Sequence, residues 1–485
     1  MGPAIKLNET PGYSKGMVPR MARWIAALAV MPLFASVPPP SAWVPARWTW
    51  TNPKTLDLLS GTPINCLLLD SYTADFASRA AARGIVTLAV FRPGADPADA
   101  ARKAVGAGMQ GIVLEGDFPT GTAARVRDAL ADKHAIVIEL TSRARMPLGG
   151  PDPIVGTYQG VWPGVQVLEN GAAKAGPSGS LWIDTNTGFI RSVRAWGPAA
   201  VWLGYLPPTR SVITGERYLE AIGDAELAGA RWIVALDDDF RSRLERGDPA
   251  ALKDWRGMAE VLEFFEGHPD WRTLRSYGKL AIVQDLADAL LSGGILDMIG
   301  ARHTPVRAIP GQRLTPESLQ GATMAVNLDV EALTAEQRQI LKDFTRAGGT
   351  VLTAPPGWKS QSVRKPDQIT LDNAELNRLD DIWHDVQTMI GRKNLGARLF
   401  NVSSMLSNVV ATEDGRQVVV ELVNYSAYPT DDVTVQVLGT FKHASLLTPA
   451  GIQKDLPVYA TDEGGTGVDL EHVSTCTTVL FRLKE

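Results

Sequence analysis

The sequence predicts an α/β protein in which a (β/α)8, TIM-like barrel is followed by a smaller flavodoxin-like α/β domain and a C-terminal β-sandwich. Its 485 residues allow roughly three domains of about 150 residues each. Short apolar runs alternate with helical patterns from Ile64 to about Phe240, which is typical of βαβ units and a parallel sheet. Helical patterns disappear after about Asn401. We therefore expect a signal region over 1–42, the barrel over 43–275, the second domain over 276–395 and the sandwich over 396–485.

The composition is that of an ordinary globular protein, with 45% hydrophobic residues, 21% charged residues and a formal net charge of −5. It excludes a disordered, collagen-like or coiled-coil chain. Basic residues form only short runs, so we expect no nucleic-acid partner. Cys66 and Cys476 are too few for a disulfide framework or a cysteine-based zinc site, and we expect both to be buried thiols.

The N-terminus has the pattern of a secretory signal. Arg20 and Arg23 precede an apolar run over 24–37, and small residues and prolines follow up to Ala42. The run is too short to span a bilayer as a mature anchor, and no later stretch is long and apolar enough. We expect an exported protein, periplasmic or extracellular, without a stable membrane span and with a mature chain that starts near Trp43.

Eight strands are expected to build the barrel. They lie at 64–70, 85–91, 111–115, 135–140, 165–168, 181–185, 200–206 and 232–237. Asp96 and Pro97 supply an N-cap and a first-turn proline to an Ala-rich helix that stops at Gly108. The number of strand and helix units and the length of this region match such a barrel. The segment 142–164 contains no convincing helix, so it is either an elaborated loop or a sign of an imperfect barrel.

The two later domains differ in their hydrophobic pattern. The second has strands at 279–283, 306–309, 322–327 and 350–353, with helices over 286–299 and 334–347. Thr334 and Gln337 form a capping box at the start of the second of these helices. The last domain has clear strands at 418–423, 433–437 and 475–483, broken by turn residues, which is typical of a β-sandwich.

Segments in both later domains resemble those of known enzymes. The stretch 333–351 runs from a capped helix through Gly348 and Gly349 into a strand. This stretch, and the stretch 418–425 with the later turn 448–451, resemble segments of multidomain glycoside hydrolases. Those enzymes are related to β-galactosidases that carry a trimerisation domain. The resemblance implies a carbohydrate substrate, hydrolysis of an O-glycosyl bond, no cofactor, and a homo-oligomer formed through the second domain. That domain contains no Cys, which excludes glutaminase chemistry.

The active site of such a barrel lies at the C-terminal ends of its strands. Acidic residues follow many of the expected strands: Asp70, Glu115, Asp117, Glu139, Glu169, Asp184 and 237–239. Glycoside hydrolysis needs two carboxyl groups that face the scissile bond. The Asn-Glu pair that ends the fourth strand in the similar enzymes is absent, so a carbohydrate-binding barrel without catalysis is the alternative function.

We expect the catalytic pair among Glu115, Asp117, Glu139 and Asp184. Glu115 and Asp117 share a face if their strand continues, and the alternative is that Asp117 caps a turn. Glu139 ends the strand counted here as the fourth, which carries a catalytic carboxylate in many barrels of retaining glycosidases, and Asp184 on the sixth would be its partner. A salt bridge to a following arginine is the alternative for Glu139.

Five residues are expected to bind substrate. Trp182 and Asn186 share a strand face with Asp184, which combines an aromatic ring, an amide and a carboxylate, the groups that bind sugars. Trp162 and Trp202 are placed to line the mouth, although each is more often a core residue. Asp237 begins a run of three aspartates that cannot all ligate one ion, so we expect it to cap a helix or face inward and expect no metal site.

Overall fold

The computed structural model describes residues 38–162, 165–167, 173–175, 186–284, 289–328, 331–354, 373–426, 428–462 and 464–483. Residues 1–37 of the expected signal region over 1–42 lie outside these ranges. The described residues belong to one compact unit. Within them, no helix has both the length and the apolar character needed to cross a membrane.

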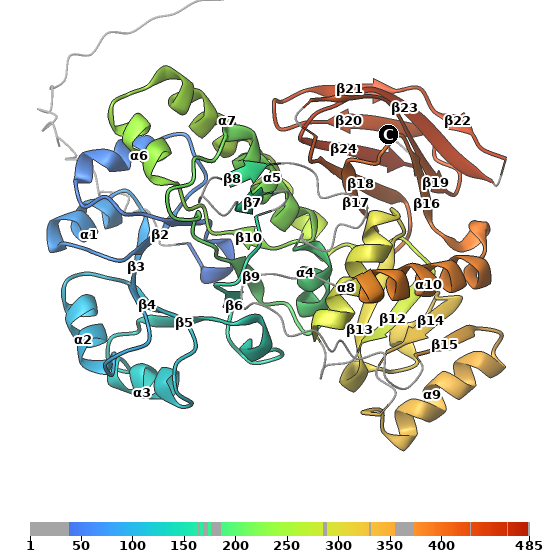
Figure 1. Ribbon diagram of the computed structural model, residues 1–485, viewed down its shortest axis with the longest axis horizontal. Helices are drawn as coiled ribbons and strands as arrows, with labels where there is room; N and C mark the ends of the chain where they lie inside the picture. Colours follow the sequence, from blue (N-terminus) through green and yellow to red (C-terminus); the bar gives the residue numbers. More distant parts are fainter. Residues whose placement is uncertain are drawn as a thin grey trace, which may run out of the picture. The chain divides into compact units, whose positions relative to one another are not determined.

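Eight parallel strands form a nearly closed barrel (Figure 1). In spatial order they are β1 (Pro45–Arg47), β2 (Cys66–Leu69), β3 (Val86–Phe91), β4 (Gly111–Glu115), β5 (Ile136–Thr141), β6 (Ile154–Thr157), β9 (Ala200–Leu203) and β10 (Arg231–Trp232). The barrel closes between its ends, because the Arg47 backbone N–H donates to the Val234 carbonyl at 2.8 Å and Ala46 pairs with Val234. The predicted barrel is therefore confirmed.

Two barrel strands differ from the prediction. The expected strand at 165–168 is instead β7 (Val165–Val167), which pairs antiparallel with β8 (Ala173–Ala175) outside the barrel sheet, and the expected strand at 181–185 lies outside the described residues. The barrel sheet also contains β1 and β6, which the sequence did not reveal because each is short and begins at or directly after a proline. The strand at 136–141 is consequently the fifth of the barrel, and β4 is the fourth.

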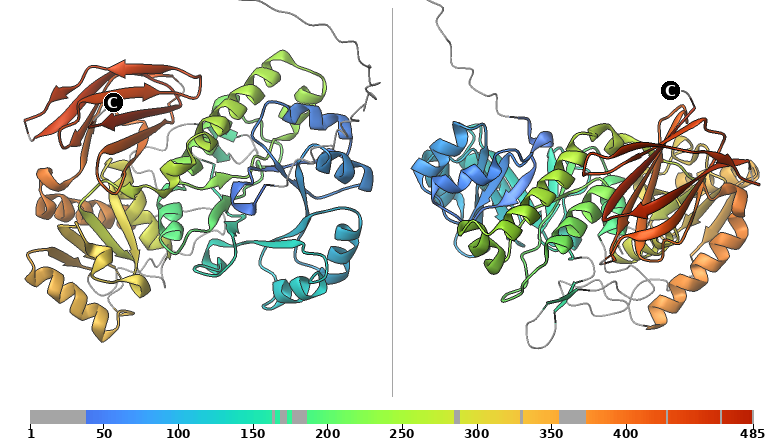
Figure 2. Two further views of the ribbon diagram at one scale, coloured as in Figure 1. Left: turned by 180° about the vertical axis from the view of Figure 1, so that it is seen from behind. Right: turned by 90° about the horizontal axis from the view of Figure 1, so that it is seen from above.

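Helices cover the outside of the barrel (Figures 1 and 2). They are α1 (Ala74–Ala81), α2 (Ala98–Gly106), α3 (Thr122–Ala129), α4 (Thr187–Arg194), α5 (Gly215–Leu227), α6 (Asp238–Glu245) and α7 (Pro249–Glu266). The connection between β5 and β6 holds only a single 3-10 turn at Arg143–Arg145. Over the described residues 142–162, the lack of an α-helix thus reflects this connection and the barrel strand β6 that follows it.

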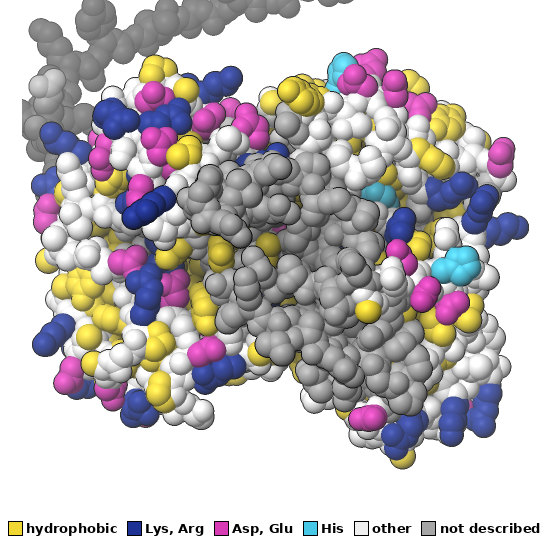
Figure 3. All heavy atoms as spheres, viewed as in Figure 1, with side chains coloured by type: hydrophobic (Ala, Val, Ile, Leu, Met, Phe, Trp, Pro, Cys, Tyr) yellow, Lys and Arg dark blue, Asp and Glu magenta, His cyan; other side chains and the backbone are white. Residues whose placement is uncertain are grey.

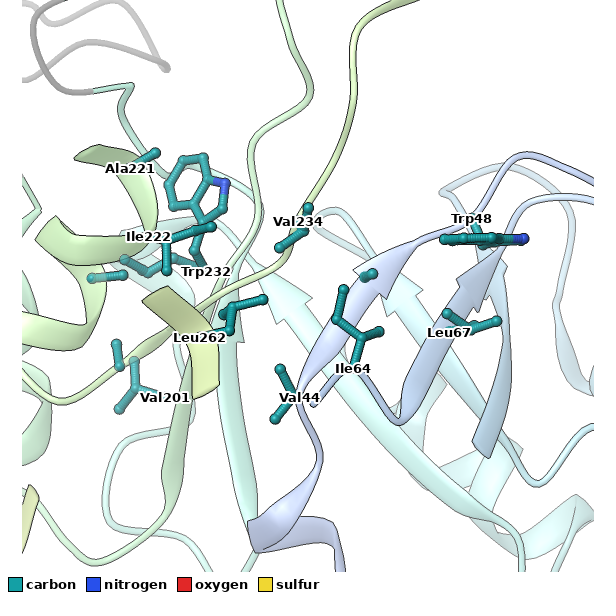
Figure 4. Close-up of a cluster of buried hydrophobic side chains, with 14 of the residues drawn as sticks. Val44, Trp48, Ile64, Leu67, Val201, Ala221, Ile222, Trp232, Val234 and Leu262 are labelled. Atoms are coloured by element: carbon teal, nitrogen blue, oxygen red, sulfur yellow. The ribbon is translucent and has the colours of Figure 1, made fainter. Parts of the chain in front are cut away.

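Alternating strand residues divide the hydrophobic side chains of the barrel into two cores. Leu68, Val113, Ile138 and Trp202 belong to the core inside the barrel. Their sequence neighbours point outward and pack against the helices, as Val201 and Val234 do beside Ile222 of α5 and Leu262 of α7 (Figure 4). This alternation decides which polar residues can reach the barrel mouth.

The second domain is an open parallel sheet in the order β13 (Val306–Pro310), β12 (Leu280–Gln284), β14 (Met324–Asn327) and β15 (Thr350–Thr353). It carries helices α8 (Ala289–Ala301), α9 (Ala335–Arg346) and α10 (Asn373–Ile390). The predicted capping box is present, since the Thr334 hydroxyl accepts from the Gln337 N–H and the Gln337 side chain accepts from the Thr334 N–H. The flavodoxin-like assignment itself stays a prediction.

The last domain, called here the C-terminal two-sheet domain, consists of two antiparallel sheets. The larger contains β11 (Arg275–Ser276), β17 (Met405–Ala411), β18 (Gln417–Asn424), β24 (Cys476–Arg482), β20 (His443–Leu447) and β21 (Gln453–Leu456). The smaller contains β16 (Ala397–Phe400), β19 (Thr430–Leu438), β23 (Gly465–Val473) and β22 (Tyr459–Ala460). One hydrophobic core joins the two sheets. Acidic and basic side chains are interspersed over the described part of the face in Figure 3.

Buried polar side chains join the three domains. Asp224 of α5 accepts hydrogen bonds from Asn186 and, at 2.7 Å, from the Tyr425 hydroxyl of the C-terminal two-sheet domain. Asp297 of α8 accepts from the Gly188 N–H at 2.6 Å and from the Thr187 hydroxyl at 3.0 Å, both in α4. The second domain is thus tied to the barrel by a buried carboxyl group.

Asp297 should make the stability of the protein depend on pH. Burial raises the pKa of this carboxyl to about 7 from its ordinary value of 3.8. Because the folded state then holds the proton more tightly, its stabilising contribution is complete below about pH 4 and is lost as the pH rises through 7. The melting temperature of the wild type should therefore fall, relative to that of Asp297→Asn, between pH 5 and pH 8. A difference that stays constant over this range would contradict the assignment.

Candidate active site

Four charged side chains meet at the C-terminal ends of consecutive barrel strands. Arg47 is the last residue of β1, Asp70 and Arg92 directly follow β2 and β3, and Glu115 is the last residue of β4. Because the strands are parallel and neighbours in the sheet, these residues emerge at one edge of the barrel. We call the four residues the mouth cluster.

Each arginine of the mouth cluster bridges both carboxylates. Arg92 contacts Asp70 Oδ1 with Nη1 at 2.8 Å and Glu115 Oε2 with Nη2 at 2.7 Å. Arg47 contacts Asp70 Oδ2 with Nη1 at 3.3 Å and donates from Nη2 to Glu115 Oε1. All four carboxylate oxygens are therefore engaged, and the two acids are fixed side by side across a guanidinium group.

Burial divides the mouth cluster into an inner and an outer pair. The side chains of Arg47 and Glu115 are 4% and 9% exposed, whereas those of Asp70 and Arg92 are 32% and 48% exposed. Burial on its own would lower the pKa of the Arg92 guanidinium, but Glu115 and Asp70 beside it raise that pKa above its ordinary value. A ligand that arrives from solvent meets Asp70 and Arg92 first.

A cleft of about 270 Å³ opens beside Arg47 and Asp70. Its other walls are the loop 206–211 after β9, residues 235–238 after β10, and Arg241 of α6. Leu206 is 47% exposed, and Arg210 adopts φ +63°, a left-handed conformation that is uncommon for a residue other than glycine. Unusual backbone of this kind gathers in binding loops, where the surrounding structure holds it in place.

Glu115 lies at the barrel mouth, but Asp117 does not share its strand face as predicted. The strand ends at Glu115, and Gly116 follows with φ +120°, so the alternation does not continue to Asp117. The Asp117 carboxylate instead accepts from the Ser142 N–H at 2.8 Å. Asp117 therefore anchors the loop after β5, which differs both from a face shared with Glu115 and from the local turn cap that the sequence suggested.

Glu139 does not reach the mouth. It points to the outer face of β5, where its carboxylate lies 3.1 Å from Arg127 of α3, while its neighbours Ile138 and Leu140 point into the barrel. Glu139 does form a salt bridge, but its partner Arg127 precedes it in the chain, whereas the sequence suggested a following arginine. Because β1 shifts the strand count by one, the carboxylate on the fourth strand is Glu115.

The two described tryptophans of the predicted binding set are core residues. Trp162 is 3% exposed, and its ring meets the rings of Tyr218 and Trp232 edge to face, with centroids 5.2 Å apart in both cases. Trp202 is fully buried inside the barrel. Neither ring is available as a platform for a sugar, so this part of the prediction is wrong. The predicted Trp182 and Asp184 lie outside the described residues.

Asn186 is a buried residue with hydrogen bonds inside the protein and does not lie at the surface of the mouth. It is fully buried, and its side-chain oxygen accepts from Arg143 Nη2 and from the Val161 N–H, each at 2.9 Å. Its amide nitrogen donates to Asp224 at 2.9 Å. Asn186 therefore fixes the chain that enters α4.

Asp237 shapes the cleft wall. One carboxylate oxygen caps α6 by accepting from the Phe240 N–H at 3.0 Å, as predicted, and the other accepts from the Ile213 N–H and the Tyr218 hydroxyl. Its neighbour Asp238 pairs with Arg241. Among the described residues, no group of three or more His, Cys, Asp and Glu side chains is placed to hold a metal ion.

Sequence reasoning missed both arginines of the mouth cluster. Arg47 ends a strand of three residues, and Arg92 directly follows β3. The available signal was a basic residue at the end of each short apolar run, close to strand-end acids. Two carboxylates that lie side by side, one of them buried, need such cations.

No known family profile matches the chain, and no curated protein sequence matches it. Its structure is similar to that of alpha-L-fucosidase isoenzyme 2 from Paenibacillus thiaminolyticus, with a TM-score of 0.63, over 91% of this chain and 100% of that one. The two chains share this fold. Their identity is 9%, so the likeness concerns the fold alone. A rhamnosidase from Novosphingobium sp. PP1Y matches 74% of this chain and 38% of its own length at 14% identity, with a TM-score of 0.44.

Proposed function

We propose that the chain is a glycoside hydrolase that cleaves an O-glycosyl bond at the barrel mouth, with Glu115 and Asp70 as its two carboxyl groups. The observation that carries this proposal is the mouth cluster itself, in which two acids stand side by side at the C-terminal ends of the second and fourth strands. A fold shared with a solved glycosidase supports it, and Glu115 ends the fourth strand, which carries a catalytic carboxylate in many barrels of retaining glycosidases.

We propose different tasks for the inner and outer pairs. One carboxyl group protonates the leaving oxygen, and the other attacks the anomeric carbon or activates a water molecule. Buried Arg47 holds both acids in position throughout. Arg92 is the more exposed arginine, so a substrate can turn its guanidinium away and free one oxygen on each carboxyl group. The displaced guanidinium then remains available to donate to sugar hydroxyls.

Several finer predictions complete the proposal. Asp184 remains a predicted further carboxylate of the site. We also propose that the chain is exported, and that the second domain supports a homo-oligomer in the manner of the β-galactosidases that the sequence resembles.

A panel of aryl α- and β-glycosides tests the proposed activity directly. The purified protein should release the aryl group from at least one fucoside, galactoside, rhamnoside or xyloside. Asp70→Asn should lower kcat/KM for that substrate by about 100-fold or more, because it removes a proton-transfer or nucleophilic group. Binding of a sugar without turnover by the wild type would overturn the proposal in favour of the non-catalytic barrel.

A further inference from the structure

A groove of about 470 Å³ crosses the smaller sheet of the C-terminal two-sheet domain. Residues of this domain line it together with Arg392 from the 3-10 turn that precedes β16, and it shares no residue with the barrel mouth. Strands β16, β19, β23 and β22 form its floor in that spatial order (Figure 1). The groove is therefore a separate surface feature that the proposed catalytic activity leaves unused.

Strand register places the groove on the outer face of this sheet. Val435 and Val437 of β19 point into the core, so Gln436 between them points outward. Gln436 pairs with Arg398 of β16 on one side and with Gly467 of β23 on the other, and Gly467 pairs with Tyr459 of β22. One row of four outward positions thus runs across the sheet from Arg398 to Tyr459.

Tyr459 forms a fixed aromatic platform at one end of this row. A Cβ built on Gly467 would lie 2.5 Å from Cε2 and Cζ of the Tyr459 ring, so the ring rests directly on the bare glycine backbone. The Tyr459 hydroxyl donates to Asp469 Oδ1 at 3.3 Å and holds the ring in place. The residue is still 38% exposed, which leaves ring surface available to a ligand.

Phe400 provides a second exposed ring at the other edge of the sheet. It is 43% exposed on β16, and the Arg398 guanidinium lies 5.4 Å from its ring centroid. Gln436 lies between the two aromatic residues, and Asp462 and Arg392 stand at the rim. The groove therefore alternates ring surface with amide, guanidinium and carboxylate groups.

This combination suits a saccharide better than other ligands. The C–H faces of a sugar ring stack on aromatic surface, while its hydroxyls exchange hydrogen bonds with planar amide, guanidinium and carboxylate groups. A purely apolar ligand would leave the polar groups of the floor and rim without partners. We propose that the groove binds a saccharide chain and acts as a carbohydrate-binding site distinct from the barrel mouth.

Affinity electrophoresis of the full-length protein tests this binding without any turnover. Native gels would contain xylan, galactan, rhamnogalacturonan or fucoidan, and at least one polysaccharide should retard the wild type. Phe400→Ala and Tyr459→Ala should each weaken the binding by about tenfold or more, since each removes an exposed ring. Tyr428→Ala is the matched control, because Tyr428 is a 77% exposed tyrosine of the same domain that does not line the groove.

The outcomes separate this proposal from the catalytic one. Hydrolysis of a small aryl glycoside should be unchanged in Phe400→Ala and Tyr459→Ala, and Glu115→Gln should be retarded like the wild type. Absence of retardation in every gel, or retardation that survives both aromatic substitutions, would overturn the proposal. A homodimer in solution that Phe400→Ala and Tyr459→Ala dissociate would overturn it too, because the groove would then be a contact between copies.

Discussion

Glu115→Gln should abolish glycoside hydrolysis, with kcat/KM about 1,000-fold or more below that of the wild type. The substitution keeps the size of the side chain but removes its charge and its ability to take or give a proton. It also removes the Glu115 charge from buried Arg47 and leaves that guanidinium paired with the Asp70 carboxylate. Loss of one partner from a buried ion pair costs about 3–5 kcal/mol, so the melting temperature should fall as well.

Glu139→Gln is the matched control for this experiment. It makes the same chemical change one strand away, but on the outer face of the barrel, where the Glu139 side chain is 29% exposed beside Arg127. Activity should stay within about twofold of the wild type, and stability should change by less than about 1 kcal/mol. Folded Glu115→Gln protein that hydrolyses as fast as Glu139→Gln would refute the role of the mouth cluster.

Trp202→Ala should lower the free energy of unfolding by about 3–5 kcal/mol. Trp202 is fully buried in the core inside the barrel, where Ile138, Leu140 and Ile233 belong to the same cluster. Removal of its indole leaves a cavity that the surrounding strands fill only in part. Urea unfolding monitored by circular dichroism measures the loss.

Trp196→Ala is the control for Trp202→Ala, because Trp196 follows α4 and is only partly buried. Removal of the Trp196 indole should lower the free energy of unfolding clearly less than removal of the Trp202 indole does. A sugar-binding Trp202 at the mouth, as expected from the sequence, would instead affect substrate affinity and leave stability unchanged. A Trp202→Ala protein with unchanged stability but a KM raised about tenfold would support the sugar-binding role of Trp202 and contradict its role in the core.

The barrel was predictable because most of its strands are apolar runs that alternate with helical patterns. Val86–Phe91 and Ile136–Thr141 are long enough to stand out, and Asp96 with Pro97 marks a helix start. Pro45–Arg47 and Ile154–Thr157 have three and four residues, respectively, and prolines or glycines interrupt their surroundings. Strands this short form because the sheet closes into a barrel around them, and this tertiary effect leaves no local pattern in the sequence.

The candidate site was predictable only in part. Glu115 was recognised from its place at the end of a strand, but a missing first strand shifted the strand count and favoured Glu139. Successive side chains of a strand point to opposite faces, so a shift by one residue moves a side chain from the barrel interior to the helix layer outside it. Arg47 and Glu115 are 68 residues apart, and their pairing depends on the barrel bringing β1 close to β4.

Affinity labelling tests the central claim most directly. An N-bromoacetyl glycosylamine of the sugar that the enzyme hydrolyses alkylates a carboxylate beside the bound sugar, whichever stereochemical course the reaction follows. Mass spectrometry of the digested protein should locate the label on Asp70 or Glu115, and excess free sugar should protect both residues. Label on Glu139 or at another position, with Asp70 and Glu115 unmodified, would contradict the mouth cluster as the active site.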